Sequence, residues 1–92
     1  MLFTLSYKGR LGTRNAAIER FLKTGGSPPA GVKMIGRWHD LAGISGFSVA
    51  ETNDPSLMAK WALDWNDLLE IDVRSVVTDE LAGPLLASVG KT

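Results

Sequence analysis

The sequence contains no cysteine and only one histidine, His39. The lack of cysteine excludes disulfide bonds, thiolate nucleophiles, zinc–thiolate sites and cysteine-ligated iron–sulfur clusters. One imidazole among scattered carboxylates forms no recognisable metal-ligand spacing. We therefore expect no metal and no cofactor. Two weaker alternatives stay open: a metal shared between two subunits, or a haem iron bound by His39.

An excess of charge of one sign is also missing, because ten Lys and Arg residues balance ten Asp and Glu residues. Such a neutral domain has no electrostatic footprint for nucleic acid or an anionic membrane. No apolar run approaches the roughly 20 residues of a membrane helix. The opening MLFTLSYKGR has neither the basic segment nor the continuous apolar core of a signal peptide. We expect a soluble, cytoplasmic protein with no nucleic-acid or membrane partner.

The 92 residues are enough for one domain, 1–92, with a thin core that a partner subunit would help to cover. Alternation of apolar and polar residues predicts strands over 2–8 and 69–78, and two further strands over 32–40 and 45–52 joined as a hairpin. Three-and-four spacing of apolar residues predicts a helix from a Thr13 cap to Gly25, and a second over 53–69 that begins at Asp54 and Pro55. A short last helix over 79–90 either packs on its own subunit or crosses to another.

The order β-α-β-β-α-β indicates an α+β, ferredoxin-like fold with a four-stranded antiparallel sheet and both helices on one face. The other face is then open, and we expect it to be covered by a second copy in a homodimer of facing sheets. Alternation assigns eleven residues to this open face: Leu2, Thr4, Ser6, Ile35, Arg37, His39, Ser48, Ala50, Asp72, Arg74 and Val76.

The segment GRWHD, residues 36–40, concentrates polar and aromatic side chains on the second strand. Neighbours on a strand point to opposite faces. We expect Gly36 and Trp38 to face the core beside Phe47, and Arg37 and His39 to face the space closed by the second subunit. An imidazole titrates near neutral pH and could serve as an acid or base, with Arg37 holding an anionic oxygen. The competing interpretation is a solvated polar face in which Arg37 pairs with a carboxylate such as Asp72 or Glu51.

The second helix carries Trp61 and Trp65 four residues apart on its apolar face. They either pack in the core or line a hydrophobic pocket for a small ligand. An RNA-recognition motif shares the same order of elements, but the third strand, SGFSVAET, lacks the leading basic residue and the second aromatic of that motif. The segment GGSPPAG lacks the Gly-Lys-Ser/Thr ending of a phosphate loop.

The combination of GRWHD, GFSVAETNDP and KWALDWNDLLEIDVRSVV resembles a family of short bacterial proteins described only as a domain of unknown function. The resemblance extends over nearly the whole chain. Such proteins are similar in outline to the dimeric α+β barrels, which include cofactor-free monooxygenases, muconolactone isomerase, stress-response barrels and haem-binding chlorite dismutases. The resemblance implies a fold and no catalytic residues.

Three functions remain open from the sequence. The first is binding of a small organic ligand, or an accessory role, with Arg37, His39, Asp72, Arg74, Trp61 and Trp65 as candidate ligand-binding residues. The second is a cofactor-independent monooxygenase or isomerase acting on a small aromatic or enolisable substrate. In that enzyme His39 moves a proton while Arg37 and Arg74 stabilise an enolate-like oxygen. The third is a protein-interaction domain that exposes a sheet edge or the last helix.

Overall fold

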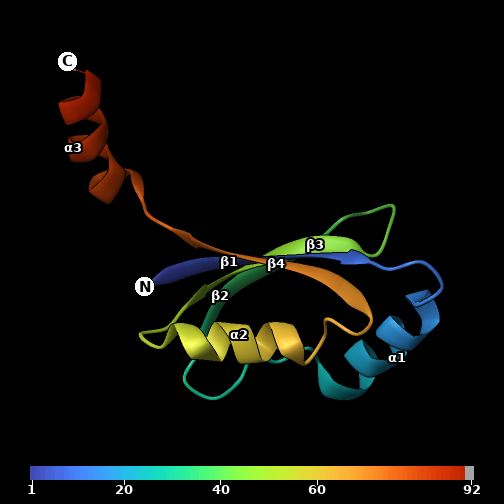
Figure 1. Cartoon of the computed structure of the whole chain (residues 1–92). Helices are drawn as coiled ribbons and strands as arrows, with labels where there is room; N and C mark the ends of the chain where they lie inside the picture. Colours follow the sequence, from blue (N-terminus) through green and yellow to red (C-terminus); the bar gives the residue numbers. More distant parts are fainter. Residues whose placement is uncertain (91–92) are drawn as a thin grey trace.

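The computed structural model describes residues 1–90 and contains four strands and three helices (Figure 1). In chain order the elements are β1 (Leu2–Gly9), α1 (Arg14–Thr24), β2 (Lys33–His39), β3 (Ser45–Glu51), α2 (Pro55–Leu63), β4 (Leu69–Val76) and α3 (Asp79–Gly90).

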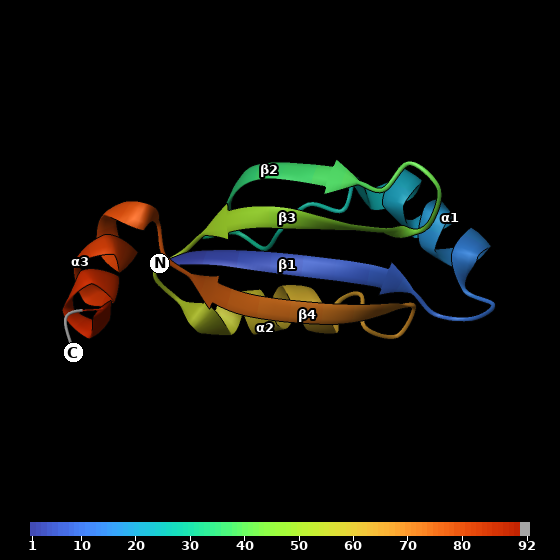
Figure 2. The same ribbon diagram turned by 90° about the horizontal axis from the view of Figure 1, so that it is seen from above.

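The strands form one antiparallel sheet in the order β2-β3-β1-β4. Helices α1 and α2 lie beneath the sheet, and no helix covers its upper face (Figures 1 and 2). This arrangement confirms the expected ferredoxin-like α+β topology, with a C-terminal helix added. No helix among residues 1–90 combines the length and apolar character needed to cross a membrane.

The two sheet-covering helices begin in different ways. Asp54 caps α2 as expected, because its carboxylate accepts the backbone N–H of Ser56 at 3.0 Å. Thr13 precedes α1, but its side chain makes no capping hydrogen bond. Its hydroxyl instead points toward the carbonyl oxygens of Arg10 and Leu68, at 2.8 and 2.7 Å. Thr13 thus connects the start of α1 to the residue before β4, and its side chain does not accept a backbone N–H group of the first helical turn.

The ends of the helices depend on local chemistry. Helix α1 ends at Gly25, whose φ of +73° suits the left-handed closing residue of a helix. Helix α2 ends at Leu63, six residues before the predicted end, and residues 64–68 form turns. This segment contains Asp64, Asn66 and Asp67, and such residues favour turns over helix interiors because their side chains compete for backbone hydrogen bonds.

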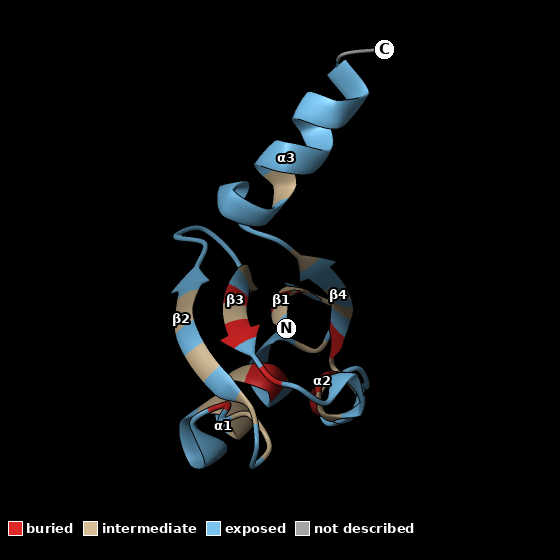
Figure 3. Cartoon of the chain, turned by 90° about the vertical axis from the view of Figure 1, so that its left-hand side faces the viewer, coloured by how far each residue is buried: buried red, intermediate tan, exposed pale blue. Residues whose placement is uncertain are grey.

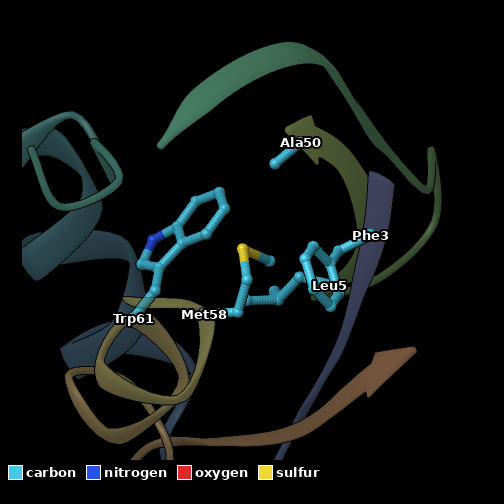
Figure 4. Close-up of a cluster of buried hydrophobic side chains, with 5 residues drawn as sticks. All are labelled: Phe3, Leu5, Ala50, Met58 and Trp61. Carbon is cyan, nitrogen blue, oxygen red and sulfur yellow. The ribbon is translucent and has the colours of Figure 1, made fainter. Parts of the chain in front are cut away.

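The core lies between the lower face of the sheet and α2 (Figure 4). Its buried cluster contains Phe3, Leu5, Ala50, Met58 and Trp61. Buried positions concentrate near the centre of the sheet and on α2, and most of the remaining surface is exposed (Figure 3). Burial of Phe3, Leu5 and Met58 contributes about 1.5–3 kcal/mol for each side chain. The core is small, as the chain length predicts.

The expected division of β3 between the two faces is wrong. Ala50 pairs with Phe3 and Ser48 pairs with Leu5, and directly paired residues share a face. Ser48 and Ala50 therefore lie on the helix-covered face, where they are 1% and 0% exposed. Phe47, expected in the core, lies on the open face and is 44% exposed.

The expected division of β2 is also wrong, because the pairing with β3 shifts between Met34 and Gly36. This bulge inserts one extra residue, which reverses the facing of every residue after it. Met34 stays below the sheet, but Trp38 lies above it beside Phe47, with ring centroids 5.2 Å apart. Arg37 and His39 lie below the sheet. Gly36 makes room for the Trp38 ring above the sheet, because a Cβ atom there would lie 2.5 Å from that ring.

Candidate functional site

A cavity of about 300 Å³ lies between the lower face of the sheet and the two helices α1 and α2. Its buried lining residues include Leu5, Ala17, Ser48, Trp61 and Leu69. The lining is predominantly apolar, and its volume falls at the lower end of the range for ligand pockets.

The cavity opens to solvent beside α1 and the β2–β3 hairpin. Leu22, His39 and Gly43 belong to its lining and are exposed residues, so they form its rim. Tyr7 and Arg37 also line the cavity and are half-buried, so they lie between its buried lining residues and its rim. The polar side chains therefore gather on the sheet side of an otherwise apolar cavity.

Tyr7, Gly46 and His39 form one row across three neighbouring strands. Gly46 on β3 pairs with Tyr7 of β1 on one side and with His39 of β2 on the other. Because Gly46 has no side chain, the Tyr7 hydroxyl reaches over β3 and hydrogen-bonds to Nδ1 of His39. A Cβ atom on Gly46 would lie 2.7 Å from that hydroxyl oxygen and would overlap the carbonyl oxygen of Trp38. The glycine is thus a steric requirement of the Tyr7–His39 pair.

The protonation of Tyr7 determines which atom of the pair donates. Burial raises the pKa of Tyr7 above its ordinary value; the positive charge of Arg37 opposes this and the negative charge of Asp40 adds to it. The hydroxyl therefore keeps its proton at neutral pH. When it donates to Nδ1 of a neutral His39 ring, the ring proton resides on Nε2, and the imidazole offers an N–H donor to a ligand.

Arg37 has a positioning role that was not expected from the sequence. Its Nη1 and Nη2 atoms donate to the carbonyl oxygens of Gly26 and Gly25, at 2.7 and 2.9 Å. These carbonyls lie at the C-terminus of α1, where a cation is favoured by the helix dipole. The guanidinium also lies 4.9 Å from the ring centroid of Phe21, which makes a T-shaped contact with the His39 ring. Arg37 thus connects β2 to the end of α1, and no carboxylate partner is found for it among the described residues.

Helix α1, which forms one wall of the cavity, has a second connection through Arg20. Its two terminal nitrogens donate to both carboxylate oxygens of Asp67 at 2.8 Å, and Nη1 also donates to the carbonyl oxygen of Asp64 at 3.0 Å. The guanidinium lies 5.4 Å from the ring centroid of Trp65. The hydrogen bonds from Arg20 hold the pKa of Asp67 below its ordinary value. Arg20 and Arg37 together hold α1 over the cavity.

The structure brings together four of the six candidate residues: Arg37, His39, Trp61 and Trp65 all line the cavity. Asp72 and Arg74 do not join them, because they pair with Ser6 and Thr4 on the open face. Arg74 donates from Nε to Asp72 at 2.8 Å, and both side chains are more than half exposed. The expectation that these two residues share a face with Arg37 and His39 is therefore wrong.

Two residues of the site were not identified from the sequence, Tyr7 and Gly46. Alternation along β1 places Tyr7 on the face opposite Thr4 and Ser6, which is the helix-covered face, but the bulge in β2 concealed that His39 shares that face. A tyrosine on one strand and a glycine on the next would have indicated the Tyr7–His39 contact only if the pairing register of β2 and β3 had been known.

Within residues 1–90, no three His, Cys, Asp or Glu side chains lie close enough together to hold a metal ion. A search of curated proteins finds no match to the sequence. A family model described as Domain of unknown function (DUF3303) matches residues 1–90. The α+β chain with the Tyr7–His39 cavity therefore belongs to the DUF3303 family.

Proposed function

We propose that the chain binds a small, planar organic molecule in the cavity beneath the sheet. The observation that carries this proposal is an apolar cavity of about 300 Å³ with one hydrogen-bonding pair, Tyr7 and His39, in its lining. Such a site favours a ligand with apolar rings and a single hydroxyl or carbonyl oxygen, because apolar contact gives affinity and a few polar groups give orientation. Binding without chemistry would make the protein an accessory module.

Naphthol and naphthalene test this proposal as a matched pair of probes. Both fill the apolar part, and only naphthol offers an oxygen to His39 or Tyr7. We expect naphthol to bind more tightly by about threefold to tenfold, the effect of one hydrogen bond. Tyr7→Phe and His39→Gln should each reduce this preference. Calorimetry and changes in NMR shifts of the lining residues measure both quantities.

Ile18→Trp provides the steric test, because Ile18 lines the cavity from α1. The larger side chain should fill the space and weaken naphthol binding at least tenfold. Leu11→Trp is the control, since Leu11 lies fully exposed in the loop before α1. Equal binding of naphthol to both variants and to the unmodified chain would place the ligand elsewhere and refute the proposal.

A second candidate function is proton transfer on an enolisable substrate without a cofactor. The Tyr7–His39 hydrogen bond favours it, because it holds the imidazole in a fixed orientation for an acid or base. The structure alters the expected roles. Arg74 lies on the opposite face of the sheet, and Arg37 already donates to two carbonyl oxygens. In this function the ring proton of His39 resides on Nδ1 and is donated to the Tyr7 oxygen, which leaves Nε2 free to accept the proton of the activated C–H. The Tyr7 hydroxyl proton, or the remaining N–H groups of Arg37, would then hold the oxygen of the enolate.

Deuterium exchange at the activated C–H of a tetralone, a bicyclic enolisable ketone, tests this candidate by NMR. The unmodified protein should raise the exchange rate above background, and His39→Gln should return it to background. Gly43→Ala serves as the control because it also changes the rim and leaves both groups intact. An unchanged rate in His39→Gln would exclude the histidine as the base.

The likeness to dimeric α+β barrels remains a prediction, which the ferredoxin-like topology supports. A cytoplasmic location likewise remains a prediction.

A further inference from the structure

Two apolar surfaces remain uncovered among residues 1–90, and both lie away from the cavity. The first, here called the aromatic patch, is the stacked pair of Trp38 and Phe47 on the open face of the sheet, 52% and 44% exposed. The second, the α3 leucines, comprises Leu81, Leu85 and Leu86, each about two thirds exposed. Large apolar side chains gathered in this way mark interaction surfaces.

Helix α3 is expected to be unstable as an isolated helix. It extends away from the sheet beyond the end of β4 and has no buried residue (Figures 1 and 3). It is 12 residues long and contains both Gly83 and Pro84, which are the two weakest helix formers. An isolated helix of this length is marginal even with favourable residues. Its stability therefore requires a surface that its own sheet does not supply in this arrangement.

The size of the molecule indicates how large that surface is. The chain exposes 6500 Å², whereas a compact monomer of 9.9 kDa exposes about 5200 Å². Its radius of gyration is 15.5 Å, against about 12 Å for a compact chain of this length. The excess of about 1300 Å² exceeds the roughly 800 Å² that each partner buries in a standard interface. One chain thus carries enough uncovered surface for a stable dimer.

We propose that α3 of one copy packs its leucines against the open sheet face of a second copy, over the aromatic patch, in a twofold-symmetric dimer. In a symmetric dimer each α3 packs on the partner's sheet, so the same contact forms twice and covers the aromatic patch and the α3 leucines of both copies. The helix points away from its own sheet and needs no rearrangement to reach a second molecule. The formal net charge of zero means that two copies associate without net repulsion.

The absence of cysteine allows a direct test by paramagnetic broadening. Ser88→Cys on α3 carries a nitroxide in an unlabelled copy, which is mixed with an isotope-labelled, unmodified copy. Broadening of the Trp38 and Phe47 amides in the labelled copy is expected, because only an intermolecular contact can cause it. A chain that carries both the isotope label and the nitroxide, diluted with unlabelled unmodified protein, reports contacts within one chain. If the Trp38 and Phe47 amides broaden only in that sample, α3 folds back on its own sheet and the proposal fails.

Light scattering tests the role of the leucines. The unmodified chain should have twice the 9.9 kDa chain mass. The double substitution Leu85→Glu and Leu86→Glu should weaken association at least tenfold, whereas Leu11→Glu, at a fully exposed loop position away from both surfaces, should not. Circular dichroism and ligand binding in the cavity confirm that the variants fold. A monomeric unmodified chain would overturn the proposal and direct the search to a different partner protein, and a dimer that survives the double substitution would overturn it as well.

Discussion

At the scale of single residues, Gly46 determines whether Tyr7 and His39 can meet. The three residues lie in one row, and the Tyr7 hydroxyl occupies the space next to Gly46 on the helix-covered face of the sheet. A glycine that looks unremarkable in a strand is therefore the residue on which the polar part of the cavity depends. Glycine within a strand often indicates such a close approach.

We predict that Gly46→Ala destabilises the chain by about 1–3 kcal/mol, the usual result of overfilling a packed site. The added methyl group would collide with the Trp38 carbonyl oxygen and displace the Tyr7 hydroxyl. Thermal unfolding measures the first effect, and the NMR signals of His39 measure the second. Gly43→Ala is the matched control in the same hairpin, because its Cβ would meet only the Ser45 hydroxyl, at 3.9 Å. Similar stability losses in both variants would contradict the steric argument.

Tyr7 also allows a direct titration, since it is the only tyrosine of the chain. We predict that phenolate absorbance appears at a pKa above the ordinary tyrosine value, because burial disfavours the charged form. A pKa raised on folding contributes stability below the unfolded pKa of about 10, and this contribution is lost as pH rises through the folded value. Circular dichroism should therefore show weaker stability at strongly alkaline pH. In Tyr7→Phe this alkaline loss should be smaller; an unchanged loss would assign it to another group.

At the scale of elements, α1 is held mainly by polar contacts at two places. Arg20 binds the turn after α2, and Arg37 binds the C-terminal carbonyls of α1. Only Ala17 of α1 is buried, so the helix contributes little to the core. This arrangement leaves the cavity beneath α1 unfilled and makes that wall easier to open than the wall formed by α2.

We predict that Asp67→Asn loosens α1 at neutral pH, seen as faster amide exchange in that helix. The pKa of Asp67 is lowered in the folded chain, so its contribution is present above the unfolded carboxyl pKa of about 4 and is lost as pH falls through the lowered value. The difference between the variant and the unmodified chain should therefore disappear in acid. Asp64→Asn is the control, because Arg20 contacts only the backbone carbonyl of Asp64. A difference that persists below pH 2 would show that the carboxylate charge is not responsible.

At the scale of the whole molecule, the chain has a small core and an extended shape. Its longest dimension is 51 Å and its shortest is 19 Å, and α3 accounts for much of the extension (Figure 1). A chain of this size buries few residues completely, so stability depends on covering the open face and α3. The dimer proposed above would provide that cover.

We predict that the unfolding midpoint rises with protein concentration, because association stabilises only the folded state. Each tenfold increase should raise the midpoint by about 3–5 °C for a dimer of two such chains. Scanning calorimetry over a hundredfold range measures the slope. The double substitution Leu85→Glu and Leu86→Glu should flatten it. A midpoint independent of concentration in the unmodified chain would show that it unfolds as a monomer.

The fold was predictable because its signals are local. Alternation in β1 and β4, the Asp54–Pro55 start of α2 and the Gly25 end of α1 depend on residues a few positions apart. The candidate site was only partly predictable. Trp61 lines a pocket between helix and sheet, one of the two places expected for it, and Asp72 and Arg74 lie on the open face as expected. Arg37 and His39 were wrongly grouped with that pair on the open face and lie in the cavity instead. One inserted residue in β2 caused the error for that strand, because a bulge reverses all later side chains.

The sequence by itself determined the order of elements, the neutral surface and the absence of thiol chemistry, since these depend on composition and on short-range spacing. The tertiary structure alone decided that the β2 bulge lies before Gly36, that Arg37 and His39 face the helices, and that Tyr7 meets His39 over Gly46. Strand register is set by contacts between residues far apart in the chain, and a shift of one residue changes no local preference while it moves every side chain to the opposite face.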